Sequence, residues 1–223
     1  MRDRVPVFRQ TTDFTCGACA TLMVWRHLDS NVQLSKQNEF LIWTEIVGLP
    51  FKFSSPYRIA EFFIKKGFET KLIMKQESVS EDIMALECCQ VEPAERKLFL
   101  DFFQAYDRTL RNRVAPAILD KKPTIYDIRK ALSNHDPIIA LVDSYYTAAA
   151  KKPPAQPHLP HWIVVTGCDN KRFHANDPAQ GKITIEKRVL EEALDTRSSF
   201  GWPSTLIIVK SKANARRTRK ASV

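Results

Sequence analysis

The chain has 223 residues, 44% of them hydrophobic, and a formal net charge of +9, which together indicate a folded globular protein and argue against a disordered one. No apolar run reaches the roughly 18 residues that span a bilayer, and residues 1–6 lack the apolar core of a signal peptide, so we expect a cytoplasmic protein with no membrane partner. The five cysteines are an odd number without a framework spacing, which argues against a secreted disulfide scaffold.

The stretch of residues 10–27 is the most informative part of the sequence. It places Cys16 where a polar turn becomes an apolar helix, and Asp13 or Thr15 is expected to cap that helix by accepting a hydrogen bond from a free N–H. A cysteine at this end of a helix lies in the positive field of the helix dipole, which stabilises the thiolate, the form that attacks a carbonyl carbon. Gln10 can donate a side-chain N–H to an oxyanion beside the sulfur. Packing alone also explains a lone buried cysteine, so the assignment of a nucleophile depends on residues later in the chain.

Three more elements are predicted before residue 75. Ser35 can cap a helix that runs through about Val47. Pro56, at a first helical position, starts a third helix that ends at Gly67. The alternation of side chains over 68–74 predicts a strand.

The middle of the chain is predicted to be mainly helical. Residues 80–89 form one expected helix, and Pro93 begins a long one that ends near Arg113. Its apolar stripe, the expected core face, consists of Leu98, Phe99, Phe102, Phe103, Tyr106 and Leu110. A capping-box pattern at Thr124 starts a short helix, and residues 137–142 form an apolar run typical of a buried strand.

A long connection over residues 143–160 leads directly into His161. Connections of this length are often functional, so we expect it to border the active-site cleft. The later elements are strands at 161–167, 172–176 and 182–186, a helix at 188–194 and a strand at 204–209. Because helices cluster first and strands last, the sequence predicts an α+β fold in a single domain over residues 1–209, with N-terminal helices packed on a C-terminal antiparallel sheet.

His161 opens one of these strands and Asp177 follows the next, so with Cys16 they supply a base, an orienting group and a nucleophile. A loop centred on Asp169 would place His161 opposite Asp177, on the same face of the hairpin. A two-residue turn at Asp169 and Asn170 would place them on opposite faces. The catalytic interpretation therefore favours a three- or five-residue loop, or a bulge.

These residues carry a resemblance to a known family. They are Gln10, Cys16-Gly17, His161-Trp-Ile-Val-Val-Thr-Gly167 and Asp177-Pro178. Together they resemble the papain-like cysteine peptidases that trim double-glycine leaders from bacteriocin precursors, and still more their free-standing relatives. The resemblance covers about Val5 to Val209 and implies a papain-like fold. It also implies Cys16 as nucleophile, His161 as base, Asp177 as orienting residue and Gln10 as oxyanion donor, acting on a peptide or peptide-like substrate, with no metal or organic cofactor.

Several alternatives remain open. The same residues would serve an acyl transferase or ligase, in which an amine instead of water accepts the acyl group. Cys16 and Cys19 also form a Cys-x-x-Cys motif, which indicates dithiol or metal chemistry, although no second pair of ligands is suitably spaced. His158 and His174 are alternative bases, and Asn176 is an alternative orienting residue.

Residues 210–223 carry six lysines and arginines and no acid, so removing them lowers the net charge from +9 to +3. We expect a basic, disordered tail, and a weak contact of this tail with nucleic acid is disfavoured because no aromatic residue interleaves with its charges. The sequence therefore predicts a cysteine hydrolase that cleaves a peptide or related amide bond through a thioester at Cys16. It leaves the oligomeric state open.

Overall fold

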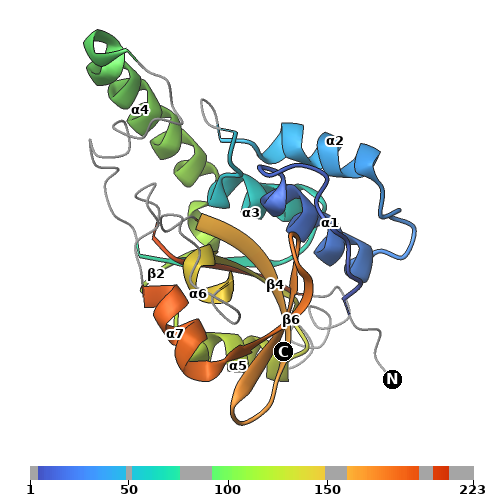
Figure 1. The fold of residues 1–223 in the computed structure, drawn as a ribbon. Helices are drawn as coiled ribbons and strands as arrows, with labels where there is room; N and C mark the ends of the chain where they lie inside the picture. Colours follow the sequence, from blue (N-terminus) through green and yellow to red (C-terminus); the bar gives the residue numbers. More distant parts are fainter. Residues whose placement is uncertain (1–4, 49–51, 76–91, 149–159, 196–202, 211–223) are drawn as a thin grey trace, which may run out of the picture.

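A seven-stranded sheet forms the centre of the computed structural model, which describes residues 5–48, 52–75, 92–148, 160–195 and 203–210 (Figure 1). The strands are β1 (Thr70–Met74), β2 (Ile118–Asp120), β3 (Ile138–Asp143), β4 (Pro160–Cys168), β5 (Arg172–Asp177), β6 (Gly181–Glu186) and β7 (Thr205–Val209). Their order across the sheet is β2-β1-β7-β3-β4-β5-β6, so β4 and β5 are neighbours near one edge.

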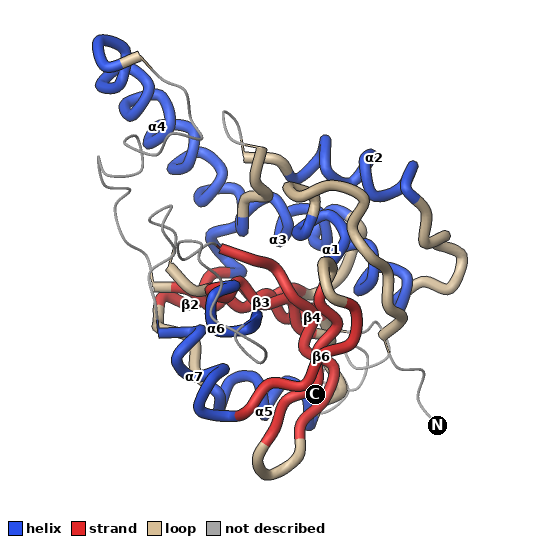
Figure 2. Tube along the Cα trace, in the orientation of Figure 1, coloured by secondary structure: helices blue, strands red, loops and turns tan. Residues whose placement is uncertain are grey.

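The helices form a layer on each face of this sheet (Figures 1 and 2). They are α1 (Cys16–Leu28), α2 (Lys36–Ile46), α3 (Pro56–Lys65), α4 (Arg96–Val114), α5 (Ile125–Ser133), α6 (Ser144–Ala148) and α7 (Lys187–Asp195), with short 3-10 turns at Pro93–Glu95 and Ala115–Ala117. Helices α1 to α4 share one apolar core with the sheet, and α5 and α7 share another. Within the described ranges, no helix is both long and apolar enough to cross a membrane.

The predicted α+β class is confirmed, but the sheet is not built from C-terminal strands alone. β1 and β2 come from the first 120 residues and pair in parallel, whereas β1–β7, β7–β3 and the β3–β6 meander are antiparallel. No sequence pattern indicated β2, because three residues are too few to show an alternation. The N-terminal half therefore supplies part of the sheet as well as the helices that cover it.

The two cores explain why the central strands are apolar at consecutive positions. Every residue of β3 is buried. Ile139 and Leu141 belong to the core under α1 to α4, and Ile138 and Ala140 belong to the core under α5 and α7. A strand covered on both faces needs apolar side chains in both directions, so it shows a continuous apolar run instead of an alternation.

Two predicted helix starts are confirmed by their hydrogen bonds. The Ser35 hydroxyl accepts from the Asn38 N–H at 3.2 Å and caps α2. At α5, the Thr124 hydroxyl accepts from the Asp127 N–H at 3.3 Å, and the Asp127 carboxylate accepts from the Thr124 N–H at 3.0 Å. These caps satisfy N–H groups that the helix itself cannot pair. The helix expected over 80–89 lies outside the described residues.

The expected core face of α4 is partly wrong. Leu98 is 74% exposed and Phe102 is 56% exposed, whereas Phe103 and Leu110 are buried. Figure 1 shows that the first turns of α4 project beyond the sheet and the other described helices. The buried face of α4 includes Leu100, Phe103 and Leu110. The periodic stripe alone is too wide to separate this face from the exposed Leu98 and Phe102.

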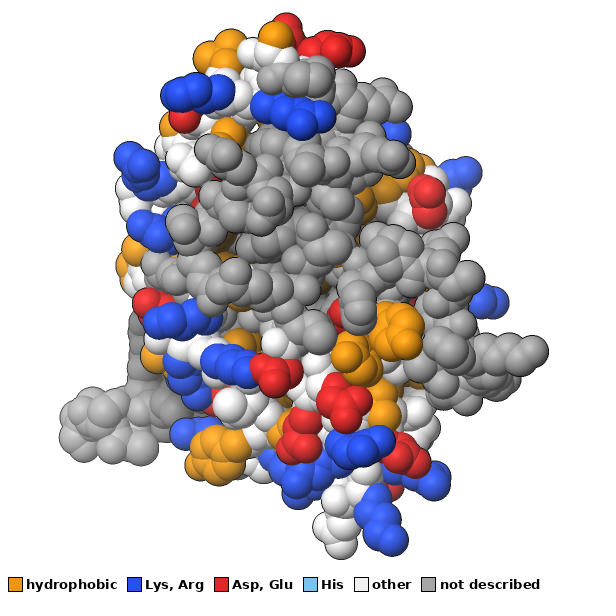
Figure 3. All heavy atoms as spheres, turned by 60° about the vertical axis from the view of Figure 1, so that its left-hand side comes forward, with side chains coloured by type: hydrophobic (Ala, Val, Ile, Leu, Met, Phe, Trp, Pro, Cys, Tyr) orange, Lys and Arg blue, Asp and Glu red, His pale blue; other side chains and the backbone are white. Residues whose placement is uncertain are grey.

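Charged side chains of both signs are interspersed on the surface. In the lower part of the face drawn in Figure 3, lysines and arginines alternate with aspartates and glutamates. Helix α7 illustrates the pattern with two ion pairs, Lys187–Glu191 and Arg188–Glu192. The two partners of each pair are one helical turn apart. Exposed pairs of this kind contribute little to stability, but they prevent charge of one sign from accumulating.

Phe103→Ala is expected to lower the free energy of unfolding by roughly 3–5 kcal/mol, because it leaves a cavity in a packed core. Phe102→Ala, on the exposed side of the same helix, is expected to cost less than about 1 kcal/mol. Urea unfolding followed by circular dichroism measures both values. Equal losses in the two variants would contradict the assigned core face.

Candidate active site

Cys16 is the first residue of α1 and is buried at the N-terminal end of that helix. The helix begins where the sequence predicts, but the expected cap is wrong. Thr15 occupies the N-cap position, yet its side chain accepts no hydrogen bond from the first turn of α1. The Thr15 hydroxyl instead donates to the carboxylate of Glu39 over 2.5 Å. The unpaired N–H groups of α1 therefore face the surroundings of the Cys16 sulfur without competition from a capping side chain.

The Cys16 thiol is hydrogen-bonded to the ring of His161, at the start of β4. Burial raises the pKa of the thiol. The hydrogen bond and charge of His161, with the backbone N–H groups of Trp162 and Gly17, outweigh that effect and hold the pKa below its ordinary value. These contacts favour the thiolate at a position that water does not reach freely.

Asp177 is the second partner of His161. Its Oδ1 lies 2.9 Å from His161 Nε2 and also accepts from the N–H groups of Ala179 and Gln180. Burial raises the pKa of this carboxyl, but His161 and the two backbone N–H groups lower it below its usual value. For His161, burial lowers the pKa, and the bonds to Asp177 and Cys16 raise it well above the ordinary value. The geometry therefore favours a thiolate, an imidazolium and a carboxylate in sequence.

A β-bulge in β4 changes the pairing of the hairpin that carries His161 and Asp177. Near the turn, Gly167 pairs with His174, but further along Val165 pairs with Ala175, which leaves Thr166 as an extra residue. Regular pairing resumes beyond the bulge. Because of the extra residue, each β4 side chain there lies, relative to β5, on the opposite face of the sheet from the one it would occupy without the bulge.

This bulge decides whether the histidine and the aspartate can meet. The turn itself is of the two-residue kind, with the N–H of Asp169 donating to the carbonyl of Arg172, and without a bulge its register would place His161 and Asp177 on opposite faces. Beyond the bulge, the register places Asp177 opposite Ile163, two residues from His161 on the same face. The expectation of direct opposition is wrong, and the alternative of a bulge is correct.

Gln10 lies beside the turn that follows Asp177. Its backbone N–H donates to the carbonyl of Pro178 at 2.9 Å. Its side-chain oxygen is buried and has no hydrogen-bond partner among the described residues. No hydrogen bond links this side chain to the cysteine–histidine pair in the described structure, so the backbone of Gln10 is fixed near the site while its carboxamide keeps unused hydrogen-bonding capacity.

Asn176, the alternative orienting residue, makes other contacts. Its side-chain nitrogen donates to the carbonyls of Val5 at 2.9 Å and Pro6 at 3.2 Å. The structure thus brings Asp177, and not Asn176, to His161. The contacts of Asn176 fix the N-terminal segment along the end of β5, a role that no local sequence signal reveals because the two partners are about 170 residues apart.

The pKa values of the two thiols of the Cys-x-x-Cys motif are shifted in opposite directions. The Cys19 sulfur donates to the carbonyl of Phe8 at 2.9 Å, and burial together with the negative charge of Glu39 raises its pKa above the ordinary value. Cys16 and Cys19 are both free thiols. No group of three histidine, cysteine, aspartate or glutamate side chains in the described ranges could hold a metal ion. Of the two cysteines, only Cys16 is activated, and Cys19 anchors the N-terminal segment to α1.

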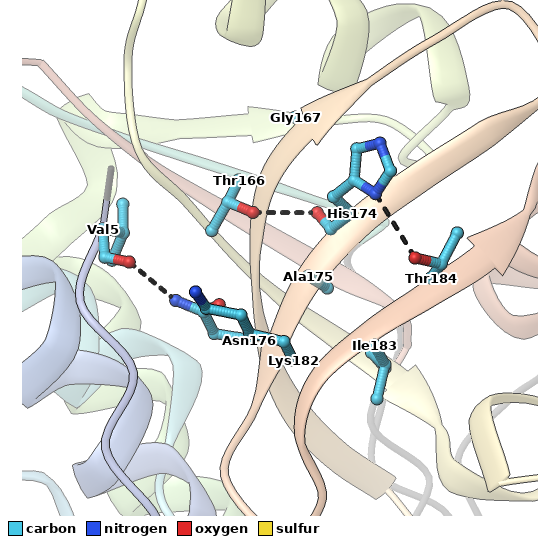
Figure 4. A pocket seen from close by; sticks show the side chains of 9 residues that line it. All are labelled: Val5, Thr166, Gly167, His174, Ala175, Asn176, Lys182, Ile183 and Thr184. Atoms are coloured by element: carbon cyan, nitrogen blue, oxygen red, sulfur yellow. Dashed lines mark hydrogen bonds between the residues drawn. The ribbon is translucent and has the colours of Figure 1, made fainter. Parts of the chain in front are cut away.

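His174, an alternative base, lies away from Cys16 on another surface. Its Nδ1 is 3.3 Å from the hydroxyl of Thr184, and its side chain is 49% exposed. It borders a hollow of about 390 Å³ (Figure 4), which is lined by Val5, Thr166, Gly167, His174, Ala175, Asn176, Lys182, Ile183 and Thr184. Cys16 and His161 are not among these residues. His158 and the rest of the connection over 149–159 lie outside the described residues.

Gly17 permits the close approach of α1 to its neighbours. A Cβ atom at this position would lie 2.4 Å from the Cβ and the hydroxyl of Ser54 and 3.0 Å from the ring of Trp162. Ser54 is buried and belongs to the segment that leads into α3. Any other residue at position 17 would overlap Ser54 and force the start of α1 and the Ser54 segment apart.

An α+β fold in which a helix begins with a buried cysteine and two antiparallel strands bring a histidine and an aspartate to it is the papain-like arrangement. Residues 5–198 match the model of the Peptidase_C39 like family. The chain therefore belongs to this family, which confirms the resemblance and the fold expected from the sequence.

Two solved structures align with nearly the whole of this chain at low sequence identity. A putative C39-like peptidase from Bacillus anthracis aligns with a TM-score of 0.50 and 10% sequence identity over 92% of this chain and 94% of its own. A double glycine motif protease from an AMS/PCAT transporter, solved with its leader peptide, aligns with a TM-score of 0.48 and 15% identity over 95% of this chain and 96% of its own. A comparison with curated proteins gave no match.

Cys16 is expected to react with iodoacetamide at pH values well below those at which an ordinary thiol reacts, because its lowered pKa keeps the thiolate populated there. Cys19 is expected to stay unmodified under the same conditions, since its pKa is raised. Peptide mapping of the alkylated protein over a series of pH values measures both. Equal labelling of the two cysteines in mildly acidic buffer would contradict the assigned thiolate.

Gly17→Ala is expected to destabilise the fold by roughly 1–3 kcal/mol, because the new methyl group overlaps Ser54. The double variant Gly17→Ala with Ser54→Gly is expected to recover part of that loss, since it removes the overlapping atoms. Thermal unfolding of the two single variants and the double variant measures the coupling. Strictly additive losses would show that the two residues do not touch.

Proposed function

We propose that this protein is a cysteine peptidase that hydrolyses a peptide or related amide bond through a thioester at Cys16. Membership of a peptidase family supports the general class. The observation that carries the finer assignment is the hydrogen-bonded row of Cys16, His161 and Asp177, whose pKa values are all shifted toward the charged forms. Perturbed groups that face one another in this way are typical of nucleophilic sites.

In the first step, the Cys16 thiolate attacks the carbonyl carbon of the substrate, and the carbonyl oxygen becomes an oxyanion. The N–H groups at the start of α1 and the side-chain N–H of Gln10 are the donors proposed for this oxyanion. The helix dipole adds a positive potential at the same point. The N–H groups of α1 are held by the helix before the reaction begins, so little reorganisation of these donors accompanies the new charge.

Collapse of the oxyanion breaks the carbon–nitrogen bond and leaves a thioester on Cys16. The His161 imidazolium gives its proton to the departing amine, and Asp177 keeps the ring in orientation. Water then loses a proton to His161 and attacks the thioester, which releases the acid and restores the thiolate.

The pKa shifts define the pH range in which this cycle runs. Below the lowered pKa of Cys16 the sulfur is protonated and no longer attacks. Above the raised pKa of His161 the ring has lost the proton that the leaving amine needs. Activity is therefore expected to fall on both sides of a broad plateau.

A peptide is the substrate class that we favour. On the coloured part of the face drawn in Figure 3, lysines and arginines are interspersed with aspartates and glutamates, so this part shows no single-sign stripe of the kind that binds a nucleic acid backbone. The proposal specifies the type of bond that is cleaved, an amide bond, and does not specify the amino-acid sequence around it.

The proposal is tested with a peptide vinyl sulfone and a library of peptide substrates. Intact mass spectrometry is expected to show one adduct per chain, which is absent from Cys16→Ala. Peptide hydrolysis is expected to fall by about 10²–10⁴ in His161→Ala and by about 10²–10³ in Gln10→Ala. Cys19→Ser and His174→Ala are the matched controls and are expected to stay near the wild-type rate.

The mass of the released acyl product separates the two reaction types. A free acid indicates hydrolysis, and an amide formed with an added amine indicates acyl transfer. Retained hydrolysis in a folded Cys16→Ala variant would refute the assigned nucleophile.

A further inference from the structure

Glu39 is a buried carboxylate that the triad does not explain. It lies in the first turn of α2 and has no exposed surface. Its oxygens accept hydrogen bonds from the Thr11 N–H at 2.9 Å, the Thr11 hydroxyl at 3.0 Å and the Thr15 hydroxyl at 2.5 Å. Among the described residues, no lysine, arginine or histidine forms an ion pair with it.

A buried charge without a cationic partner is costly, so its contacts indicate what it stabilises. The dipole of α2 and three charge-assisted hydrogen bonds offset part of this cost. All three bonds go to Thr11 and Thr15, at the two ends of the segment that joins Gln10 to Cys16. Glu39 therefore fixes the segment that carries both the proposed oxyanion donor and the proposed nucleophile.

Thr15 shows how this contact reaches the sulfur. A threonine at the N-cap ordinarily accepts a hydrogen bond from an N–H of the first turn. In this structure its hydroxyl donates to Glu39 and also lies 3.0 Å from the Thr12 hydroxyl and 3.3 Å from the Thr12 carbonyl, and it does not cap α1. The first-turn N–H groups are left for other acceptors, and that of Gly17 donates to the Cys16 sulfur.

We propose that Glu39 is a positioning residue: by binding the Thr15 hydroxyl, it keeps the N-cap side chain off the first turn of α1 and leaves those N–H groups to the Cys16 sulfur and the reaction oxyanion. The inference rests on the proposed function, because the thioester reaction gives the free N–H groups their use. It assigns to a residue of α2 an effect on a sulfur that it does not touch.

The charge of Glu39 also distinguishes the two thiols of the motif. It contributes to the raised pKa of Cys19 and is not among the causes that act on Cys16. Burial is the main cause of the raised pKa of Cys19, and the negative charge of Glu39 adds to it.

The test is the pH profile of Cys16 alkylation by iodoacetamide in four proteins: wild type, Glu39→Ala, Thr15→Val and the double variant. In Glu39→Ala the Thr15 hydroxyl loses its shortest hydrogen bond and keeps only its contacts with Thr12, so it is expected to turn to the first turn and cap α1, which moves the profile to higher pH by about 0.5–1 unit. Thr15→Val is expected to keep the wild-type profile, because no hydroxyl competes for the N–H groups. The double variant is expected to return to the wild-type profile for the same reason.

Peptide hydrolysis supplies a second readout. Glu39→Ala is expected to lower kcat by about 10- to 100-fold with KM nearly unchanged. Glu39→Gln retains an oxygen acceptor and is expected to recover most of the rate. Glu45→Gln, an exposed glutamate on the same helix, is the control. If Glu39→Ala does not fold by circular dichroism, Glu39→Asp, whose shorter side chain withdraws from Thr15, takes its place.

An unshifted alkylation profile in Glu39→Ala, or a shift that persists in the double variant, would overturn the positioning role. The profile needs no peptide substrate, so it is independent of the proposed function. If the alkylation profile is unshifted in Glu39→Ala while Cys16-dependent hydrolysis is intact, the positioning role of Glu39 is refuted and the proposed function still stands. A Thr15-dependent shift without any Cys16-dependent hydrolysis would remove the proposed reaction and leave the effect of Glu39 on the sulfur standing.

Discussion

The buried pair of Cys16 and His161 is the interaction on which the rest of the site depends. Burial by itself raises the pKa of a thiol and lowers that of an imidazole, so an uncompensated pair would become neutral. The surrounding structure supplies the hydrogen bonds that water would otherwise give. The thiolate accepts from backbone N–H groups of α1 and β4, and Asp177 accepts from the turn after β5.

Most of this support comes from the backbone of regular elements. β4 contributes both the ring of His161 and the N–H of Trp162, so one buried strand holds two groups against the same sulfur. Its neighbours β3 and β5 pair with it on both sides and limit its movement. Groups held by a central strand are kept in position more accurately than groups on a loop, which suits a site whose charges must meet within hydrogen-bond distance.

Local signals were sufficient for some features and insufficient for others. The caps at Ser35 and Thr124 arise from chemistry within four residues, so they are visible in the sequence. The start of α1 at Cys16 was also predicted, although the cap expected for it is absent. The bulge at Thr166 and the burial of Glu39 are set by contacts between distant segments. A threonine in an apolar strand shows no sign of a bulge, and a glutamate in the first turn of a helix normally indicates a solvated face.

The extra residue in β4 also limits how the length of the hairpin can change over evolution. His161 and Asp177 are 16 positions apart. The turn alone would place them on opposite faces of the hairpin, and the one unpaired residue of the bulge brings them to the same face. Deleting one residue from the bulge, or inserting one into the turn, would exchange the inner and outer side chains of half the hairpin. Relatives that keep both groups in contact should therefore differ in this hairpin by substitutions, or by insertions and deletions of an even number of residues. Connections elsewhere on the surface can change by any number of residues.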